Sequence, residues 1–161
     1  MTALLIVVLG IAFFALIMLS IALHEVGHMV PAKLFGVKVT EYFVGFGKRI
    51  WSFRRGETEY GIKWIPLGGY VRLVGMYPPA RPGGRRSWLT RMADDARAAE
   101  WDDITPADEG RLVYQQATWK KIIIMLGGPM MNILLAFLIF LGINLVHGSY
   151  VATPVSYTHL R

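Results

Sequence analysis

Two long apolar runs dominate the pattern of residues along the chain. No charged residue occurs from Ala3 to Leu23 or from Ile122 to Val146, and each run meets the roughly 20 residues needed to cross about 30 Å of hydrocarbon. A secretory signal peptide is the alternative for the first run, but no basic residues precede it and no small-x-small cleavage site follows it. We therefore predict two transmembrane helices, one over residues 1–35 and one within residues 114–148.

The region between the two runs begins with a β-strand pattern. Every second residue from 60 to 64 is apolar, and Arg-Arg-Gly at 54–56 predicts a turn just before this alternation. Residues 65–75 then combine a proline and two adjacent glycines with apolar flanks, which is more apolar than a surface turn needs. These three residues are Pro66, Gly68 and Gly69. We predict that residues 36–76 form a small hairpin or sheet whose last part dips back toward the membrane.

Two further segments differ in composition from the rest. Residues 77–113 contain several prolines and glycines followed by mixed charges, and this predicts a flexible cytoplasmic linker with one short helix. Residues 149–161 are expected to form an extracytoplasmic tail. The sequence VSYTHLR at 155–161 is unlike the start of a further domain, and we expect it to be non-native and the predicted coding sequence to be truncated.

The charge distribution fits a membrane protein. The chain of 161 residues is 54% hydrophobic and carries a net charge of +6, and 16 of its 17 Lys and Arg residues lie between Lys33 and Lys121. The positive-inside rule places this loop in the cytoplasm and both termini outside the cell. Because acidic residues are interleaved with the basic ones, the charge suits lipid headgroups and not nucleic acid.

The predicted fold class is therefore membrane α-helical. Two transmembrane helices are joined by a cytoplasmic loop that contains a small membrane-associated β-hairpin or sheet. The expected location is the inner (plasma) membrane, as a multi-pass protein in contact with the lipid bilayer.

The sequence HEVGH occupies residues 24–28 at the end of the first apolar run. Residues four apart on a helix share one face, so His24 and His28 can present both imidazoles to a single metal ion. The chain has no cysteine, so any metal ligands must be His, Asp or Glu. Glu25 can take a proton from a water on a zinc ion, which is the chemistry of peptide hydrolysis.

Chance is the alternative explanation for this motif, since HExxH also occurs in proteins without a metal. In a membrane helix, however, a charged residue costs roughly 2.5–3.5 kcal/mol at the centre and less toward the interface, which disfavours a chance occurrence. A second polar element is GGPMMN at residues 127–132. Taken alone it favours helix packing through small residues, with Asn132 making one polar contact.

Together these motifs resemble the bacterial site-2 protease family of intramembrane zinc metalloproteases, especially its regulator of sigma factor branch from actinobacteria. The resemblance covers about residues 10–148. The motifs that carry it occur in the family's order: HEVGH (24–28), YFVGFG (42–47), RRGETEYGIKWIPLGGYVRL (54–73), YQQATWK (114–120) and GGPMMN (127–132).

The resemblance implies roles for the residues of the motif and for the chain as a whole. His24 and His28 would be ligands of Zn²⁺ and Glu25 the general base. The implied substrates are single-span membrane proteins already trimmed by another protease, such as anti-sigma factors, and leftover signal peptides.

The resemblance also implies a cavity beside the metal. The segment around Pro66, Gly68 and Gly69 would be a membrane-reentrant β-hairpin that lines this cavity and holds substrate by strand addition. Asn132 would line the site or pack against the first helix.

The third ligand in the family is an Asp on a later membrane helix, which we expect to lie outside this chain. Glu41, Glu57 and Glu59 are the alternative ligands within it. The expected function is a zinc-dependent intramembrane endopeptidase, here as an incomplete N-terminal part that is inactive alone. The alternatives are a non-catalytic membrane protein that binds client transmembrane helices and a transporter with a His and Glu proton relay.

Overall fold

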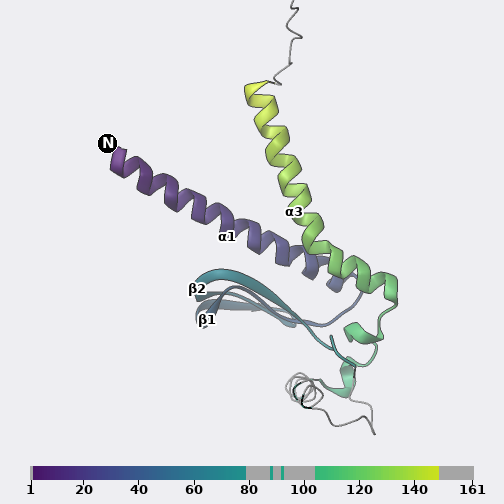
Figure 1. Cartoon of the computed structure of the whole chain (residues 1–161). Coiled ribbons are helices and arrows are strands. Elements are labelled where there is room, and N and C mark those ends of the chain that lie inside the picture. The colour runs from purple at the N-terminus through teal and green to yellow at the C-terminus, as the bar shows by residue number, and fades with distance from the viewer. Residues whose placement is uncertain (1, 79–87, 89–91, 93–103, 149–161) are drawn as a thin grey trace, which may run out of the picture.

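Two long helices and one bent β-hairpin make up the fold (Figure 1). The computed structural model describes residues 2–78, 88, 92 and 104–148. The predicted tail and most of the predicted linker lie outside these residues. In chain order the elements are α1 (Thr2–Leu34), β1 (Val39–Arg55), β2 (Thr58–Leu73), the 3-10 helices η1 (Pro106–Asp108) and η2 (Val113–Gln115), and α3 (Thr118–His147).

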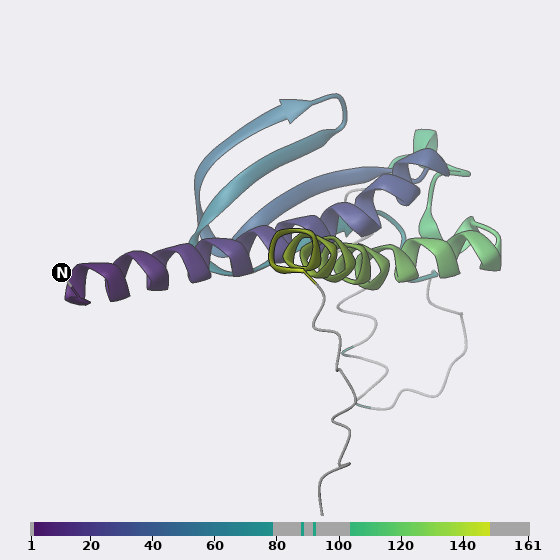
Figure 2. The same ribbon diagram turned by 90° about the horizontal axis from the view of Figure 1, so that it is seen from above.

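Helices α1 and α3 are both long and apolar enough to cross a membrane, in agreement with the two predicted spans. They pack where the second half of α1 crosses the first half of α3, and they diverge from there (Figures 1 and 2). Each contains one internal proline, Pro31 in α1 and Pro129 in α3. Helix α3 is bent in Figure 1, as expected where a proline removes a backbone N–H.

Strands β1 and β2 form an antiparallel hairpin that folds back on itself. They pair next to their connecting turn and again at their far ends, where residues 41–44 pair with 69–72. Residues 41–44 also align with 59–62 along their other edge. Both strands must bend for this double pairing, and Gly45 (φ 92°) and Gly68 (φ 93°) adopt the positive φ angles that favour glycine.

The segment 65–75, predicted to be the last part of the hairpin or sheet, is continuous with the rest of the hairpin. Strand β2 runs through Pro66 as far as Leu73. Residues 66–68 have no partner on β1, so the missing N–H of the proline costs no hydrogen bond of the sheet. The predicted turn at 54–56 is present, with the strands ending and starting on either side of residues 56 and 57.

The chain that leads into α3 packs against the base of the hairpin. The Lys38 N–H donates to the Arg111 carbonyl (3.1 Å), and the Val113 N–H donates to the Val74 carbonyl (3.0 Å). Val113 is buried. The flexible linker predicted for 77–113 therefore does not extend through its last residues, because these backbone hydrogen bonds and buried side chains fix them.

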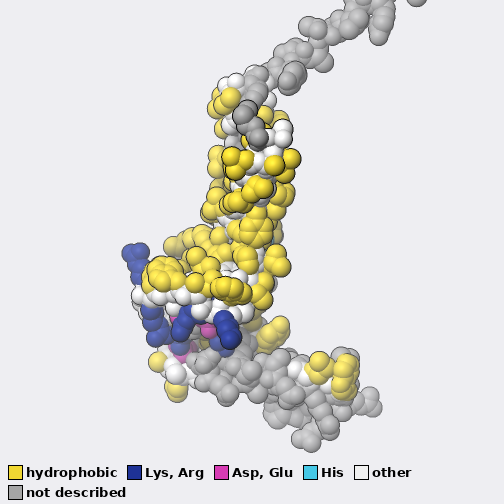
Figure 3. Space-filling model, turned by 90° about the vertical axis from the view of Figure 1, so that its left-hand side faces the viewer, with side chains coloured by type: hydrophobic (Ala, Val, Ile, Leu, Met, Phe, Trp, Pro, Cys, Tyr) yellow, Lys and Arg dark blue, Asp and Glu magenta, His cyan; other side chains and the backbone are white. Residues whose placement is uncertain are grey.

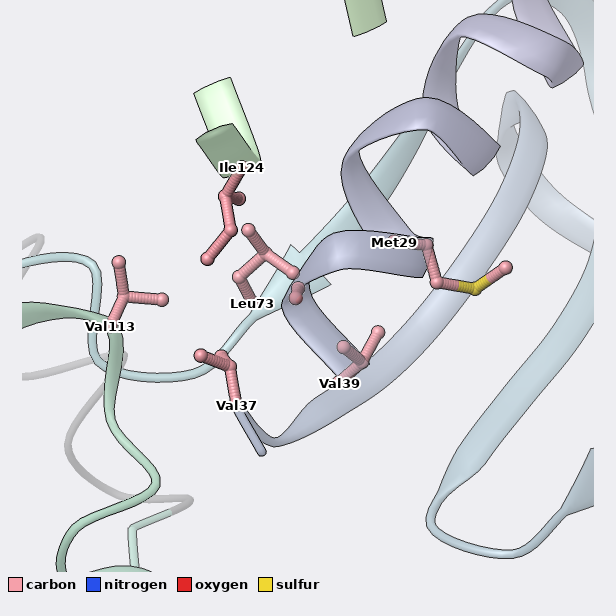
Figure 4. Close-up of a cluster of buried hydrophobic side chains, with 7 residues drawn as sticks. Met29, Val37, Val39, Leu73, Val113 and Ile124 are labelled. Carbon is pink, nitrogen blue, oxygen red and sulfur yellow. The ribbon is translucent and has the colours of Figure 1, made fainter. Parts of the chain in front are cut away.

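One buried hydrophobic cluster joins all parts of the fold. It takes residues from both helices, both strands and the segment before α3. Figure 4 shows its members Met29, Val37, Val39, Leu73, Val113 and Ile124. The cluster fixes the second half of α1, the hairpin and the start of α3 relative to one another.

Asp108, in the segment before α3, makes an ionic contact with Lys38. Its buried Oδ2 accepts hydrogen bonds from Lys38 Nζ (2.8 Å), from the Thr105 N–H (2.9 Å) and from Thr105 Oγ1 (2.8 Å). The bond from Lys38, followed by the backbone bond from Thr105, lowers the pKa of Asp108 from 3.8 to about 2. Since the folded pKa lies below the ordinary value, this contribution to stability is present above about pH 4 and is lost as the pH falls toward 2.

We expect Asp108→Asn to loosen the segment before α3 at neutral pH. A hydrogen bond to a charged group contributes roughly 1.5–3 kcal/mol, so hydrogen exchange of the backbone amides of residues 108–116 should accelerate about tenfold or more. The difference from the unmodified chain should shrink between about pH 4 and pH 2. Glu109→Gln, at the exposed neighbouring position, is the matched control, and equal exchange in both variants would contradict the assigned role of Asp108.

Candidate metal centre at the crossing of the helices

The two histidines of the HEVGH motif converge where α1 crosses α3. Their Nε2 atoms are 3.3 Å apart, and the two rings meet edge to face with centroids 5.0 Å apart. Two nitrogen ligands at about 2.0–2.1 Å from one tetrahedral zinc ion lie about 3.3–3.4 Å apart. The spacing of His24 and His28 thus fits two ligands of one ion.

His28 is oriented through its other ring nitrogen. Nδ1 of His28 donates to the carbonyl oxygen of Ile124 in α3 at 2.8 Å, and because a carbonyl can only accept, Nδ1 must carry the hydrogen. Nε2 then carries no hydrogen and can bind a metal ion through its lone pair, which faces Nε2 of His24 at 3.3 Å. His24 differs, since its Nδ1 is buried with no hydrogen-bond partner in the described part of the chain.

The wall of the site on α3 is the backbone of Gly128. A Cβ at this position would lie 2.3 Å from Nε2 of His28 and 2.7 Å from Nε2 of His24. Both distances are far below van der Waals contact. Only glycine therefore leaves room for the two imidazoles in their present positions.

Gly127, next to Gly128 on α3, determines how closely the two helices approach. A Cβ on Gly127 would lie 1.9 Å from the carbonyl oxygen of Gly27, and a Cβ on Gly27 would lie 2.3 Å from the carbonyl oxygen of Gly127. The backbones of α1 and α3 are thus in direct contact, as small residues permit in pairs of membrane helices. The predicted packing role of GGPMMN is confirmed for Gly127, and Gly128 adds a contact to the histidines.

Glu25 lies on the side of α1 that faces the hairpin. A Cβ on Gly69 of β2 would lie 3.3 Å from Cγ of Glu25 and 3.4 Å from Cγ2 of Ile21. The Tyr42 hydroxyl donates to the carbonyl of Ala22 at 2.8 Å. Burial raises the pKa of Tyr42, and the nearby Glu25 carboxylate raises it further, so Tyr42 stays a protonated phenol next to the motif.

Of the predicted cavity residues, Gly69 is the one that contacts the motif within the described chain. Pro66 is exposed, and Gly68 packs on Phe46, where a Cβ would lie 2.6 Å from ring atom Cε2. Asn132 is exposed about one helical turn beyond the glycine pair. No hydrogen bond joins its side chain to other described residues. The cavity roles of Pro66, Gly68 and Asn132 stay predictions.

The three acidic residues considered as alternative third ligands are bound elsewhere on the hairpin. Glu41 accepts hydrogen bonds from Tyr70 and Arg72, Glu57 from Arg111, and Glu59 from Ser52 and Arg49. The bond from Arg111 lowers the pKa of Glu57, and the bonds from Ser52 and then Arg49 lower the pKa of Glu59. Among the described residues no group of three or more His, Asp or Glu is placed to hold a metal.

Two contributors to this site were missed by the sequence analysis. The carbonyl of Ile124 could not be identified from the sequence, because every residue has a backbone carbonyl and only the crossing of the helices brings this one to His28. Gly128 could have been identified, because two adjacent glycines on a helix point in different directions. A packing contact with one neighbouring helix therefore explains only one of the two glycines.

Comparison with known proteins identifies the family. The chain matches Peptidase family M50 over residues 12–159. It is 42% identical to the zinc metalloprotease Rip1 of Mycobacterium tuberculosis over 142 residues, which are 88% of this chain and 30% of that protein.

Two other bacteria have similar proteins at lower identity. A putative zinc metalloprotease of Thermotoga maritima is 33% identical over 86% of this chain and 23% of its own length. One of Helicobacter pylori is 34% identical over 88% of this chain and 35% of its own length. The chain therefore spans about a third or less of these relatives. On the match to the family and the identity to Rip1, the chain belongs to Peptidase family M50, the site-2 proteases.

Proposed function

We propose that this chain supplies two zinc ligands and the general base of a zinc-dependent intramembrane endopeptidase, as the N-terminal part of a longer enzyme. The observation that carries the proposal is the 3.3 Å separation of the His24 and His28 Nε2 atoms. The relatives named above are called zinc metalloproteases or putative zinc metalloproteases, and each is about three or more times longer than the matched region. A third ligand, by family resemblance an Asp, would come from outside these 161 residues.

The residues at the crossing fit a zinc ion. His24 and His28 would hold it through Nε2, and Nε2 of His28 carries no hydrogen because Nδ1 is the nitrogen that donates to the Ile124 carbonyl. Zinc in such a site supplies a Lewis acid that polarises a peptide carbonyl and makes a water molecule more acidic.

Glu25 would act as the general base. Its carboxylate takes a proton from the attacking water and passes that proton to the departing amine nitrogen. Gly69 of β2 lies against the Glu25 side chain, so a substrate backbone paired with this strand would be brought to the carboxylate. Strand addition would also hold the substrate in an extended form, in which its peptide bonds are accessible.

The proposed substrates are single-span membrane proteins, such as anti-sigma factors. We place α1 and α3 across the inner membrane, with the hairpin at the cytoplasmic side and both termini outside. Figure 3 supports this arrangement: hydrophobic side chains cover the helical part, and Lys and Arg side chains gather around the sheet. The positive-inside rule then assigns the sheet to the cytoplasmic side.

Zinc content is the first test of the proposal. The 161-residue chain and a version extended through the following membrane spans would be purified in detergent, each with a His24→Ala variant. We expect the extended chain to hold about one equivalent of zinc and to lose it in the variant, because removing one of the nitrogen ligands removes most of the affinity.

Two results would count against the proposal. If neither chain holds zinc, the pair of histidines is not a metal site, and a non-catalytic protein that binds client helices becomes the better explanation. If the short chain alone holds one equivalent as tightly as the extended chain, the third ligand lies within these residues and the proposed division of the site is wrong.

A further inference from the structure

We propose that α3 positions the metal ligands: the Ile124 carbonyl fixes the tautomer and ring orientation of His28, and Gly128 keeps the space in which both Nε2 atoms meet. This inference rests on the proposed function, because it assigns to α3 a role in a zinc site whose described ligands both lie on α1. It makes the crossing of the two helices a requirement for metal binding.

The hydrogen bond between His28 and the Ile124 carbonyl determines which ring nitrogen of His28 carries the hydrogen. Nδ1 of His28 in α1 donates to the Ile124 carbonyl oxygen in α3 at 2.8 Å, and the two residues are 96 positions apart in sequence. Ile124 is fully buried, so water cannot replace its carbonyl without opening the core. Partners of this kind hold ligand histidines in one tautomer, and their loss typically lowers metal affinity about 10–100-fold.

The contact depends on how closely the helices approach. Gly127 and Gly27 touch through their backbones, so any side chain at 127 must move α3 away from α1. Ile124 lies about one turn before Gly127 on α3, and its carbonyl would move away from His28 as well. Gly127→Ala is therefore expected to break the orienting hydrogen bond without changing a ligand.

Gly128 acts through different atoms. The three atoms nearest to a Cβ there belong to the two imidazoles, and these rings can turn aside while the helices stay together. Gly128→Ala should thus keep the fold but separate the two Nε2 atoms. Gly142, also on α3, has nothing within 4 Å of an added Cβ, and Gly142→Ala is the matched control.

The first measurement uses the metal-free 161-residue chain in detergent micelles at about pH 8, where an ordinary imidazole is neutral. Nitrogen NMR of ¹⁵N-labelled histidine, assigned by substitution, reports which ring nitrogen of His28 carries the hydrogen. We expect hydrogen on Nδ1 in the unmodified chain and in Gly142→Ala, and loss of this preference in Gly127→Ala. Hydrogen on Nε2 of His28 in the unmodified chain would overturn the inference.

The second measurement is the affinity of the extended chain for Zn²⁺ alone, by competition with a chelator. We expect Gly127→Ala and Gly128→Ala to weaken binding about 10–100-fold and Gly142→Ala to change it less than twofold, with equal helix content by circular dichroism. Unchanged affinity in Gly128→Ala would refute the positioning role. If the unmodified extended chain binds no zinc but His28 has the expected tautomer, the proposed function fails while the assignment of the Ile124 contact stands.

Discussion

Glu25→Gln is expected to abolish peptide cleavage by the extended enzyme while leaving its zinc in place. Glutamine keeps the size of the side chain and its contact with Gly69 but cannot accept a proton. A positioned general base contributes roughly 10²–10⁴-fold to the rate, so cleavage should fall by at least about 100-fold. Zinc content should not change, because Glu25 is not among the proposed ligands.

The measurement is cleavage of a labelled transmembrane peptide in detergent, followed at saturating zinc. Glu109→Gln is the matched control: this exposed glutamate lies in the segment before α3, away from the helix crossing, and its variant should retain activity within about twofold. Activity of Glu25→Gln within tenfold of the unmodified enzyme would remove Glu25 from the role of base. Loss of zinc in the same variant would instead make Glu25 a ligand.

The features predictable from sequence were those governed by local pattern. Uncharged runs of sufficient length predicted both long helices, and the four-residue spacing of His24 and His28 placed them on one helix face. Alternation and an Arg-Arg-Gly turn predicted the hairpin. In each case the property depends on residues near one another in the chain, so periodicity contains the necessary information.

Features that depend on distant contacts were not predictable in the same way. β2 continues through Pro66 because residues 66–68 have no partner on β1, which only the bent sheet reveals. The lead-in to α3 is ordered by hydrogen bonds to Lys38 and Val74, far away in sequence. The contact between Ile124 and His28 likewise follows from the helix crossing and from no motif of its own.

The helix crossing itself is the feature most sensitive to a small change. Gly27→Ala on α1 would place a Cβ 2.3 Å from the Gly127 carbonyl oxygen, 2.7 Å from its carbon and 3.0 Å from Cα of Gly128. All three are backbone atoms of α3, which cannot turn aside as a side chain can. Overpacking of this kind typically lowers the free energy of unfolding by about 1–3 kcal/mol. Here the steric clash can be removed only if the two helices move apart.

Gly10→Ala, on the same helix, is the control, and it is expected to keep or raise stability where Gly27→Ala lowers it. An added Cβ at Gly10 has nothing within 4 Å, and alanine in a helix interior is favoured over glycine by roughly 0.5–1 kcal/mol. In an SDS titration of the detergent-purified chain followed by circular dichroism, we expect Gly10→Ala to unfold at or above the midpoint of the unmodified chain. Gly27→Ala should unfold well below it. Equal midpoints for the two variants would mean that α1 and α3 do not pack through this glycine, and the convergence of His24 and His28 on α3 would then have no structural support.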